Sequence, residues 1–189
     1  PADITARYLQ FLFEEQNSQI VVVNEQTLNT PSNSKTTINA GKKSLLLANR
    51  PDLTRWGSGE IQIQAFQLDN GLQTGSYLFE YGQQLKLTIQ AKAAVDVSSP
   101  FIGFGFSFRN TKGLDIITFT TFEDNIHFQG LQAGQTITLN FETKNILAPG
   151  SYALVLNIEK RLNNKPQYLD FIENAILFTV VSEKHIFSL

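Results

Sequence analysis

Short segments in which apolar and polar residues alternate follow one another through most of the chain after residue 55. Side chains at every second position of a β-strand share a face, so this alternation predicts strands with one side in a core. The expected strands are 61–68, 84–91, 101–109, 115–121, 136–142, 151–159, 167–172 and 175–181. Turn residues separate them and no long helical pattern interrupts them, which predicts an all-β, antiparallel sandwich of seven or eight strands.

The segment 100–113, PFIGFGFSFRNTKG, is the expected centre of this sandwich. Its large apolar side chains stand at two-residue spacing and so share one face: Ile102, Phe104, Phe106 and Phe108. Gly103, Gly105 and Ser107 lie between them and have almost no bulk. Glycine inside a strand costs stability, so two of them indicate that a ligand, a bulge or another backbone comes close. We therefore expect an uncovered outer side on which something binds or packs.

The N-terminal part of the chain has a different pattern. Residues 1–13 carry apolar side chains at nearly helical spacing after Asp3, a plausible N-cap, which predicts a short helix. Residues 14–54 are rich in polar residues, and their apolar islands are 19–23 and 44–49. This composition is typical of a linker, with room for one strand that docks elsewhere. We expect a helix and linker over 1–54 and the sandwich over 55–189.

Charge and composition exclude several classes of partner. Fifteen basic residues against seventeen acidic ones, with no block of one sign, argue against nucleic acid or an anionic membrane surface. No apolar run approaches the ~20 residues that cross a bilayer. Cysteine is absent, which removes disulfides and thiolate metal sites. Methionine is also absent, even at the start, so we interpret the chain as part of a longer polypeptide.

No catalytic signature stands out in the sequence. The phosphate-binding glycine motifs and the G-x-S-x-G elbow of hydrolases are missing. His127 and His185 lack the spacing of metal ligands. The acidic residues Glu123 and Asp124 are adjacent and fit a solvated loop. We therefore expect no enzyme activity, no cofactor and no metal site.

Sugar binding requires no catalytic residues, and two faces of the predicted sheets are candidates for it. One is a uniformly polar face that also fits ordinary solvation: Gln62, Gln64, Lys86, Thr88, Gln90, Thr136, Thr138 and Asn140. The other is the small-residue side of 101–109, extended by Ala153, Val155 and Leu177. Small residues flanked by aromatic, basic and amide side chains would form a concave floor, although the apolar members could instead form a dimer contact. The predicted ligand-binding residues are Phe101, Gly103, Gly105, Ser107, Arg109, Asn157 and Thr179.

Six motifs occur in the order found in a known family. They are RWGSGEIQI (55–63), GQQLKLTI (82–89), SPFIGFGFSFRNTKGLDI (99–116), LQAGQTITLNF (131–141), LAPGSYALVLNI (147–158) and ENAILFTV (173–180). In this order they resemble the C-terminal domain of Wzt, the nucleotide-binding subunit of ABC transporters that export O-antigen polysaccharide. The opening PADITARYLQFL resembles the end of the ATPase domain that precedes this module.

The resemblance implies an immunoglobulin-like, often dimeric β-sandwich that binds the modified non-reducing end of the O-antigen of lipopolysaccharide. It also implies a cytoplasmic location at the inner membrane, with the transmembrane subunit as a partner through the missing ATPase domain. The ATPase motifs are absent from this chain, so we do not expect it to hydrolyse ATP. Two alternatives stay open: a structural dimerisation module, and a glycan-active enzyme, which would need two carboxylates roughly 5 to 10 Å apart in a cleft.

Overall fold

The computed structural model describes residues 19–23, 46–48, 50–70, 77–99, 101–126, 128, 130–162 and 165–183. Every regular element within these ranges is a β-strand. The helix predicted for residues 1–13, both histidines and most of the predicted linker lie outside the described residues. The all-β prediction is confirmed for the part of the chain that the structure describes.

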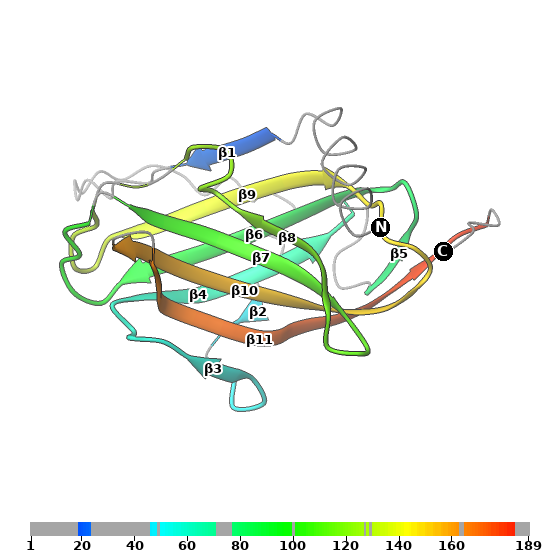
Figure 1. Ribbon diagram of the computed structural model, residues 1–189, viewed down its shortest axis with the longest axis horizontal. Coiled ribbons are helices and arrows are strands. Elements are labelled where there is room, and N and C mark those ends of the chain that lie inside the picture. The colour runs from blue at the N-terminus through cyan, green and yellow to red at the C-terminus, as the bar shows by residue number, and fades with distance from the viewer. Residues whose placement is uncertain are drawn as a thin grey trace, which may run out of the picture.

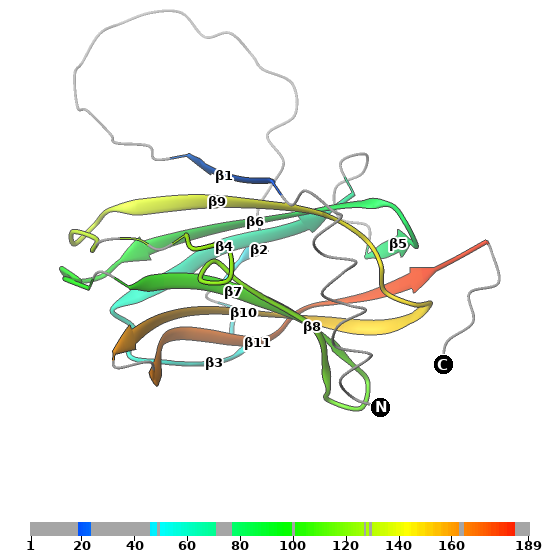
Figure 2. The same cartoon turned by 45° about the horizontal axis from the view of Figure 1, so that its top comes forward.

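The strands form two sheets that pack face to face (Figures 1 and 2). Sheet A contains, in spatial order, β1 (Gln19–Val23), β9 (Thr136–Lys144), β6 (Gln84–Ala93), β4 (Ile61–Asp69) and β2 (Leu46–Leu47). Sheet B contains β3 (Thr54–Trp56), β11 (Lys165–Val181), β10 (Gly150–Leu162), β7 (Ile102–Asn110) and β8 (Asp115–Thr120). The short β5 (Leu78–Glu80) pairs with β11 in parallel, whereas the other pairings are antiparallel.

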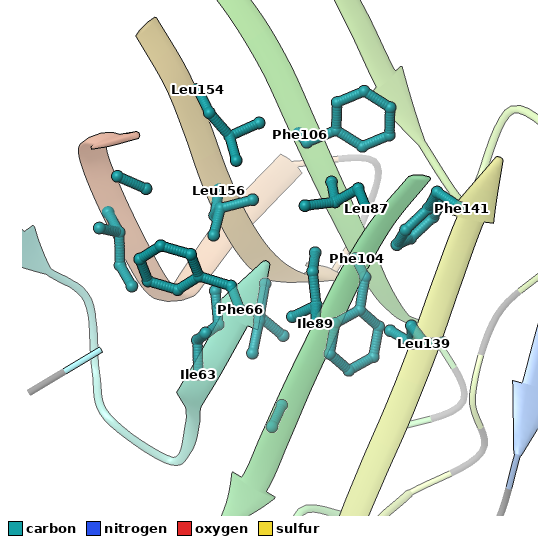
Figure 3. Packing of buried hydrophobic residues seen from close by; sticks show 14 of the residues in the cluster. Ile63, Phe66, Leu87, Ile89, Phe104, Phe106, Leu139, Phe141, Leu154 and Leu156 are labelled. Carbon is teal, nitrogen blue, oxygen red and sulfur yellow. The ribbon is translucent and has the colours of Figure 1, made fainter. Parts of the chain in front are cut away.

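The core lies between the sheets and follows the predicted alternation. On β6, Leu85, Leu87 and Ile89 are buried, while the polar residues between them are half-buried on the outer side. Phe104 on β7 faces Ile89 and Leu139 of sheet A across this core (Figure 3). Phe106 stands 5.4 Å, centroid to centroid, from Phe141 in an edge-to-face arrangement. Aromatic contacts of this kind stabilise a core beyond the burial of apolar area.

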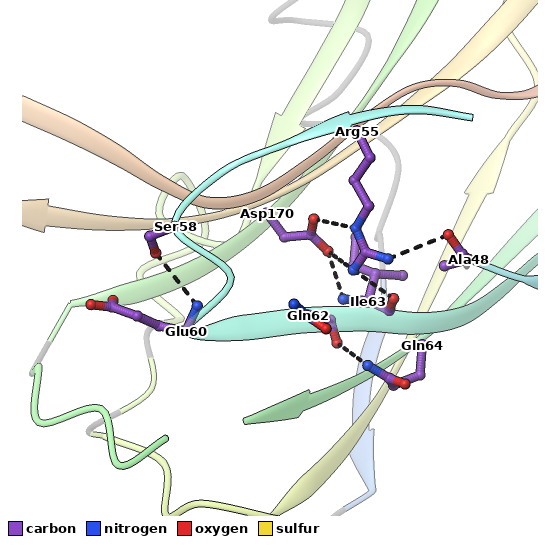
Figure 4. A network of polar contacts seen from close by, with 8 residues as sticks. All are labelled: Ala48, Arg55, Ser58, Glu60, Gln62, Ile63, Gln64 and Asp170. Atoms are coloured by element: carbon purple, nitrogen blue, oxygen red, sulfur yellow. Dashed lines mark hydrogen bonds and ion pairs between the residues drawn. The ribbon is translucent and has the colours of Figure 1, made fainter. Parts of the chain in front are cut away.

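An ion pair within sheet B, between the partly buried Arg55 and the buried Asp170, also hydrogen-bonds to backbone groups of sheet A (Figure 4). Arg55 on β3 donates from Nε and Nη2 to both carboxylate oxygens of Asp170 on β11, at 2.7 and 2.6 Å. Its guanidinium group also donates to the carbonyl oxygens of Ala48 and Ile63, which belong to the opposite layer. The Ile63 amide donates to Asp170 Oδ2 at 2.7 Å. These contacts, which we call the inter-sheet clamp, satisfy the charges on both sides.

The structure corrects one prediction about the strands. The segments 167–172 and 175–181 are not two strands but the single 17-residue β11. Leu154 pairs with Ile176 and Leu156 with Ile172, so three residues of β11 lie opposite Val155. Asn174, in this bulge, adopts a positive φ of 51° that lets the strand continue.

The segment predicted as a linker supplies strands to sheet A. Its two apolar islands contain β1, which pairs with β9, and β2, which pairs with β4. The sequence interpretation allowed for one docking strand. The boundary of the domain at residue 54 stays a prediction.

Candidate functional site on the outer side of sheet B

The strand register of sheet B places five residues in one row across its outer side. Trp56 on β3 pairs with Phe171 on β11, which pairs with Asn157 on β10. Asn157 pairs in turn with Gly105 on β7, and Gly105 with Thr120 on β8. We call Trp56, Phe171, Asn157, Gly105 and Thr120 the transverse row. At about 4.8 Å between neighbouring strands, the row extends for roughly 19 Å.

Three aromatic rings gather at one end of this row. The Trp56 indole stacks on Phe171 with centroids 4.5 Å apart and an interplanar angle of 17°. Tyr168 contacts both rings edge-on, at 5.1 and 5.2 Å. Trp56 is 46% exposed, and its Nε1 donates to Glu173 Oε1 at 3.4 Å. This aromatic platform (Trp56, Tyr168, Phe171) therefore offers a fixed apolar ring surface beside a carboxylate.

The two glycines of β7 are covered by side chains of the same chain. A Cβ added at Gly103 would come within 2.2 Å of the Phe122 ring. A Cβ at Gly105 would lie 2.8 Å from Asn157 Oδ1 and 2.9 Å from the Phe119 carbonyl oxygen. Both glycines and Ser107 are buried. The prediction of an uncovered floor is therefore wrong. The side chains of Phe122 and Asn157 occupy the space that the two glycines leave.

Two oxygen atoms on the transverse row have no hydrogen-bond partner within the described part of the chain. They are Asn157 Oδ1 and Thr120 Oγ1, and both are buried. Buried polar atoms are nearly always hydrogen-bonded in native proteins, so two unpartnered oxygens on one row are unusual. A polar ligand or water settling on the row is one source of the missing partners.

Beside the transverse row, the Arg161 side chain packs over the Phe122 ring. The guanidinium carbon of Arg161 stands 4.2 Å from the ring centroid, a distance typical of a cation–π contact. Its Nε donates to Glu159 Oε1 at 2.9 Å. The Glu159 side chain is almost fully buried. Burial of this carboxylate is possible because Arg161 compensates its charge.

The other end of the face carries a second arginine. Arg109 on β7 donates from Nε and Nη2 to the two carboxylate oxygens of Asp115 on β8, at 2.8 and 3.3 Å. Ser107 Oγ donates to Asp115 Oδ1 at 3.0 Å. The hydrogen bond from Arg109 holds the pKa of Asp115 below its ordinary value, and the same bond raises the pKa of Arg109. The pair therefore stays ionised at neutral pH.

An open hollow lies next to Arg109. Its volume is about 630 Å³. Its lining combines hydroxyl, amide and apolar side chains, among them Tyr77, Asn110, Ser151, Leu177 and Thr179. The hollow therefore lies at the end of sheet B opposite the aromatic platform.

The structure brings the predicted site residues onto one face, although not into one pocket. Gly105 and Asn157 lie on the transverse row, and Arg109 and Thr179 line the hollow. Gly103 and Ser107 lie on the same side of β7, and Phe101 precedes that strand and is exposed. Whether each residue contacts a ligand stays a prediction.

Sequence reasoning missed the aromatic platform. Tyr168 and Phe171 are three positions apart, so simple alternation assigns them to opposite faces. A register shift between Ile158 and Glu159 of β10 brings both to the outer side. One signal in the sequence could have indicated the platform. It is Trp56, the single tryptophan of the chain, which lies just before the first predicted strand.

Part of the competing polar face on sheet A is occupied by contacts between its own strands. Thr88 Oγ1 donates to Asn140 Oδ1 at 2.9 Å, and Lys86 pairs with Glu142 at 2.9 Å. These cross-strand pairs fit the solvated face that the sequence left as an alternative.

Metal binding and membrane spanning concern two further features of the described residues. Within them, no group of three or more His, Cys, Asp or Glu side chains could hold a metal ion. No helix in the same part of the chain is long and apolar enough to cross a membrane.

Comparison with known proteins identifies a family and a solved structure with the same fold. The family model described as the Wzt C-terminal domain matches residues 52–188. The crystal structure of the C-terminal domain of Wzt superimposes with a TM-score of 0.62 at 18% sequence identity, covering 74% of this chain and 90% of that one. This likeness shows that the two chains share a fold.

Two further solved structures are more distant. An alkylpurine DNA glycosylase from Pseudomonas fluorescens, bound to DNA with an abasic site analogue, has a TM-score of 0.39 at 11% identity and covers 65% of this chain and 31% of its own. A CARDB domain from Pyrococcus furiosus, in complex with two metal ions, has a TM-score of 0.35 at 15% identity and covers 76% of this chain and 99% of its own. Both TM-scores are too low to support a conclusion about the fold or function of this chain. No curated protein matches the sequence.

Proposed function

The chain belongs to the Wzt C-terminal domain family, and on this premise we propose that it recognises the modified non-reducing terminus of an O-antigen polysaccharide before export by an ABC transporter. Membership of the family supports a non-catalytic, carbohydrate-binding module of an O-antigen transporter in general. The observation that supports the finer proposal is the transverse row, which joins an exposed aromatic platform to an amide side chain with an unpartnered oxygen.

The chemistry of this row fits a sugar. The C–H face of a pyranose ring packs on an aromatic ring, and its hydroxyl groups donate to and accept from amides, carboxylates and guanidinium groups. The Trp56 indole is held in place by Phe171 and Tyr168, so little side-chain entropy is lost when a ring stacks on it. Asn157, which follows Phe171 in the row, supplies a planar amide. A terminal sugar on Trp56 would thus have this amide two strand spacings away, roughly 10 Å.

The length of the face suits a chain end rather than a single sugar. Six residues separate Gly103 from Arg109, which corresponds to roughly 20 Å along β7. In this proposal the terminus occupies the aromatic platform, and the following sugars extend toward Arg109. Gly103 and Gly105 then contribute indirectly, because their missing side chains let Phe122 and Asn157 lie flat against β7.

We also propose that the chain forms a homodimer. Exposed apolar side chains follow the outward side of β11 and the adjoining β5: Tyr77, Leu78, Leu177 and Val181, of which Leu177 is 68% exposed. Contiguous exposed apolar residues commonly mark a protein contact, and we assign this cluster to a homodimer. Residues 1–54 would connect the module to an ATPase domain on the cytoplasmic side of the inner membrane. The transmembrane subunit would bind through that domain.

The direct test is calorimetric titration of this chain with O-polysaccharide from its own source, with the terminal modification present or removed. We expect saturable binding only when the modified end is present. Trp56→Ala should weaken that binding about tenfold, which corresponds to the loss of one ring-stacking contact. Tyr81 is a matched control because it is an aromatic residue of similar exposure, 45%, in the turn before β6. Tyr81→Ala should bind normally.

A second matched pair distinguishes the two candidate faces. Asn157→Ala removes the amide of the transverse row, and Asn140→Ala removes an amide from the outer side of sheet A. We expect binding to weaken only in the first variant. Loss only in the second would transfer the site to sheet A. A folded dimer that binds neither form of the polysaccharide would favour the structural dimerisation module instead.

A further inference from the structure

Charged groups on either side of the transverse row are already paired with one another. The outer side of sheet B carries two guanidinium groups there, Arg109 and Arg161, and three carboxylates, Asp115, Glu159 and Glu173. Two positive charges and three negative ones leave a net charge of −1. Each arginine makes its shortest ion pair with a carboxylate of the same face.

The two arginines are poorly placed to receive an anion. Arg161 bonds Glu159 through Nε and Nη2, both at 2.9 Å, and its flat side rests on Phe122. Arg109 engages Asp115 with Nε and Nη2, and its Nη1 lies 4.0 Å from Glu173 Oε2. A phosphate or carboxylate would have to displace one of these partners, and it would do so beside the remaining acidic groups. Like charges at such distances repel.

Glu173 extends this argument to the aromatic platform. Its carboxylate accepts from the Trp56 indole at 3.4 Å, so an acidic group borders the surface on which a sugar would stack. A carboxylate in this position accepts hydrogen bonds from hydroxyl groups and disfavours a negatively charged substituent.

We infer that the sugar terminus taken by this face is uncharged: a neutral, hydroxyl-bearing pyranose without phosphate, sulfate or carboxylate groups. This inference rests on the proposed function and adds the charge class of the ligand to it. The paired arginines serve as hydrogen-bond donors to hydroxyl groups through their remaining N–H bonds, and the carboxylates serve as acceptors. Recognition then depends on stacking and hydrogen bonding rather than on charge.

Salt dependence of binding tests the inference on the intact chain. O-polysaccharide from the source cell is titrated at about 0.02 M and about 0.5 M salt, between which exposed charge interactions become strongly screened. A neutral ligand should bind with a Kd that changes less than about twofold. Inorganic phosphate and glucuronate, added as competitors, should leave the Kd unchanged. A Kd that rises tenfold or more with salt, or competition by either anion, would overturn the inference while leaving the proposed function intact.

A charge variant adds a gain-of-function test. Asp115→Asn removes the main charged partner of Arg109, so that Glu173, 4.0 Å from Nη1, is the remaining counter-charge and Nε and Nη2 become available to an anion. We expect inorganic phosphate to bind this variant about tenfold more tightly than the parent chain, as a charge-assisted hydrogen bond would provide. Asp52→Asn is the control, since Asp52 is exposed and its ion-pair partner, 3.8 Å away, is Arg50 rather than an arginine of this face. An unchanged phosphate affinity in Asp115→Asn would overturn the argument that pairing is what excludes anions.

Two failures are distinguishable in this design. Absence of saturable polysaccharide binding at either salt concentration contradicts the proposed function, and the inference is then wrong with it. Salt-sensitive binding contradicts the inference alone.

Discussion

Two arginine–aspartate pairs of sheet B use the same bidentate chemistry on opposite sides of the sheet. Arg55 and Asp170 face the interior, where the Asp170 side chain is 3% exposed and backbone groups of the other layer complete the contacts. Arg109 and Asp115 join neighbouring strands on the outer side, and the Asp115 side chain is 38% exposed. The first pair connects residues 115 positions apart and the second connects residues six apart.

This difference indicates what each pair is for. A buried pair stabilises a fold only if every charge is satisfied, and the inter-sheet clamp meets that condition with backbone groups that cannot rearrange. An exposed pair contributes little to stability, and its remaining N–H bonds and lone pairs can still meet the hydroxyl groups of a ligand. The clamp is therefore a structural contact, whereas the Arg109–Asp115 pair is available to a binding site.

The largest expected effect is on the clamp. Asp170→Ala leaves Arg55 without its carboxylate in a mostly buried position, so the free energy of unfolding should fall by roughly 3–5 kcal/mol. For a domain of this size the melting temperature should fall by roughly 10 °C. The measurement is thermal and denaturant unfolding of the whole chain. Asp115→Ala is the matched variant and should lose less than about 1 kcal/mol. Equal losses in the two variants would contradict the comparison.

A smaller effect tests whether the outer side is covered as described. Gly105→Ala places a methyl group 2.9 Å from the Phe119 carbonyl oxygen, which belongs to the backbone and cannot turn away. The free energy of unfolding should therefore fall by about 1–2 kcal/mol. Gly150→Ala is the control, because its Cβ would meet only the Tyr152 ring, at ordinary contact distances from 3.5 Å. A neutral Gly105→Ala would show that this part of the face is open.

The smallest effect is that of acid on the outer pair. Arg109 lowers the pKa of Asp115, so the stability that this pair contributes is fully present above the ordinary aspartate pKa of about 3.9. That contribution is lost as the pH falls through the lowered pKa of the folded state. The difference in unfolding free energy between the parent chain and Asp115→Asn should be below about 1 kcal/mol at neutral pH and should shrink at pH 3. A difference that grows in acid would contradict this assignment.

The sequence predicted the layers of the fold better than the surface of the site. The unbroken alternation of apolar and polar residues was enough to assign Leu87 and Leu139 to the core. A shift of one residue in either strand would turn all its apolar side chains to the solvent, so the register is strongly specified. The bulge at Asn174 depends on pairing with β10, so the sequence suggested two strands where β11 is one. The glycines of β7 were correctly singled out as a place of close approach. The group that approaches Gly103 is Phe122, from a turn that sequence reasoning did not connect with the site.

Trp56 has a consequence for how this protein can be observed. It is the single tryptophan of the chain, and it lies half-exposed beside the carboxylate of Glu173. Indole fluorescence responds to the polarity and the quenching groups around the ring. Excitation of tryptophan therefore yields light from one known position on the outer side of sheet B. The chain carries an intrinsic optical probe at the place where a sugar is proposed to stack, and occupancy could be followed there without any attached dye.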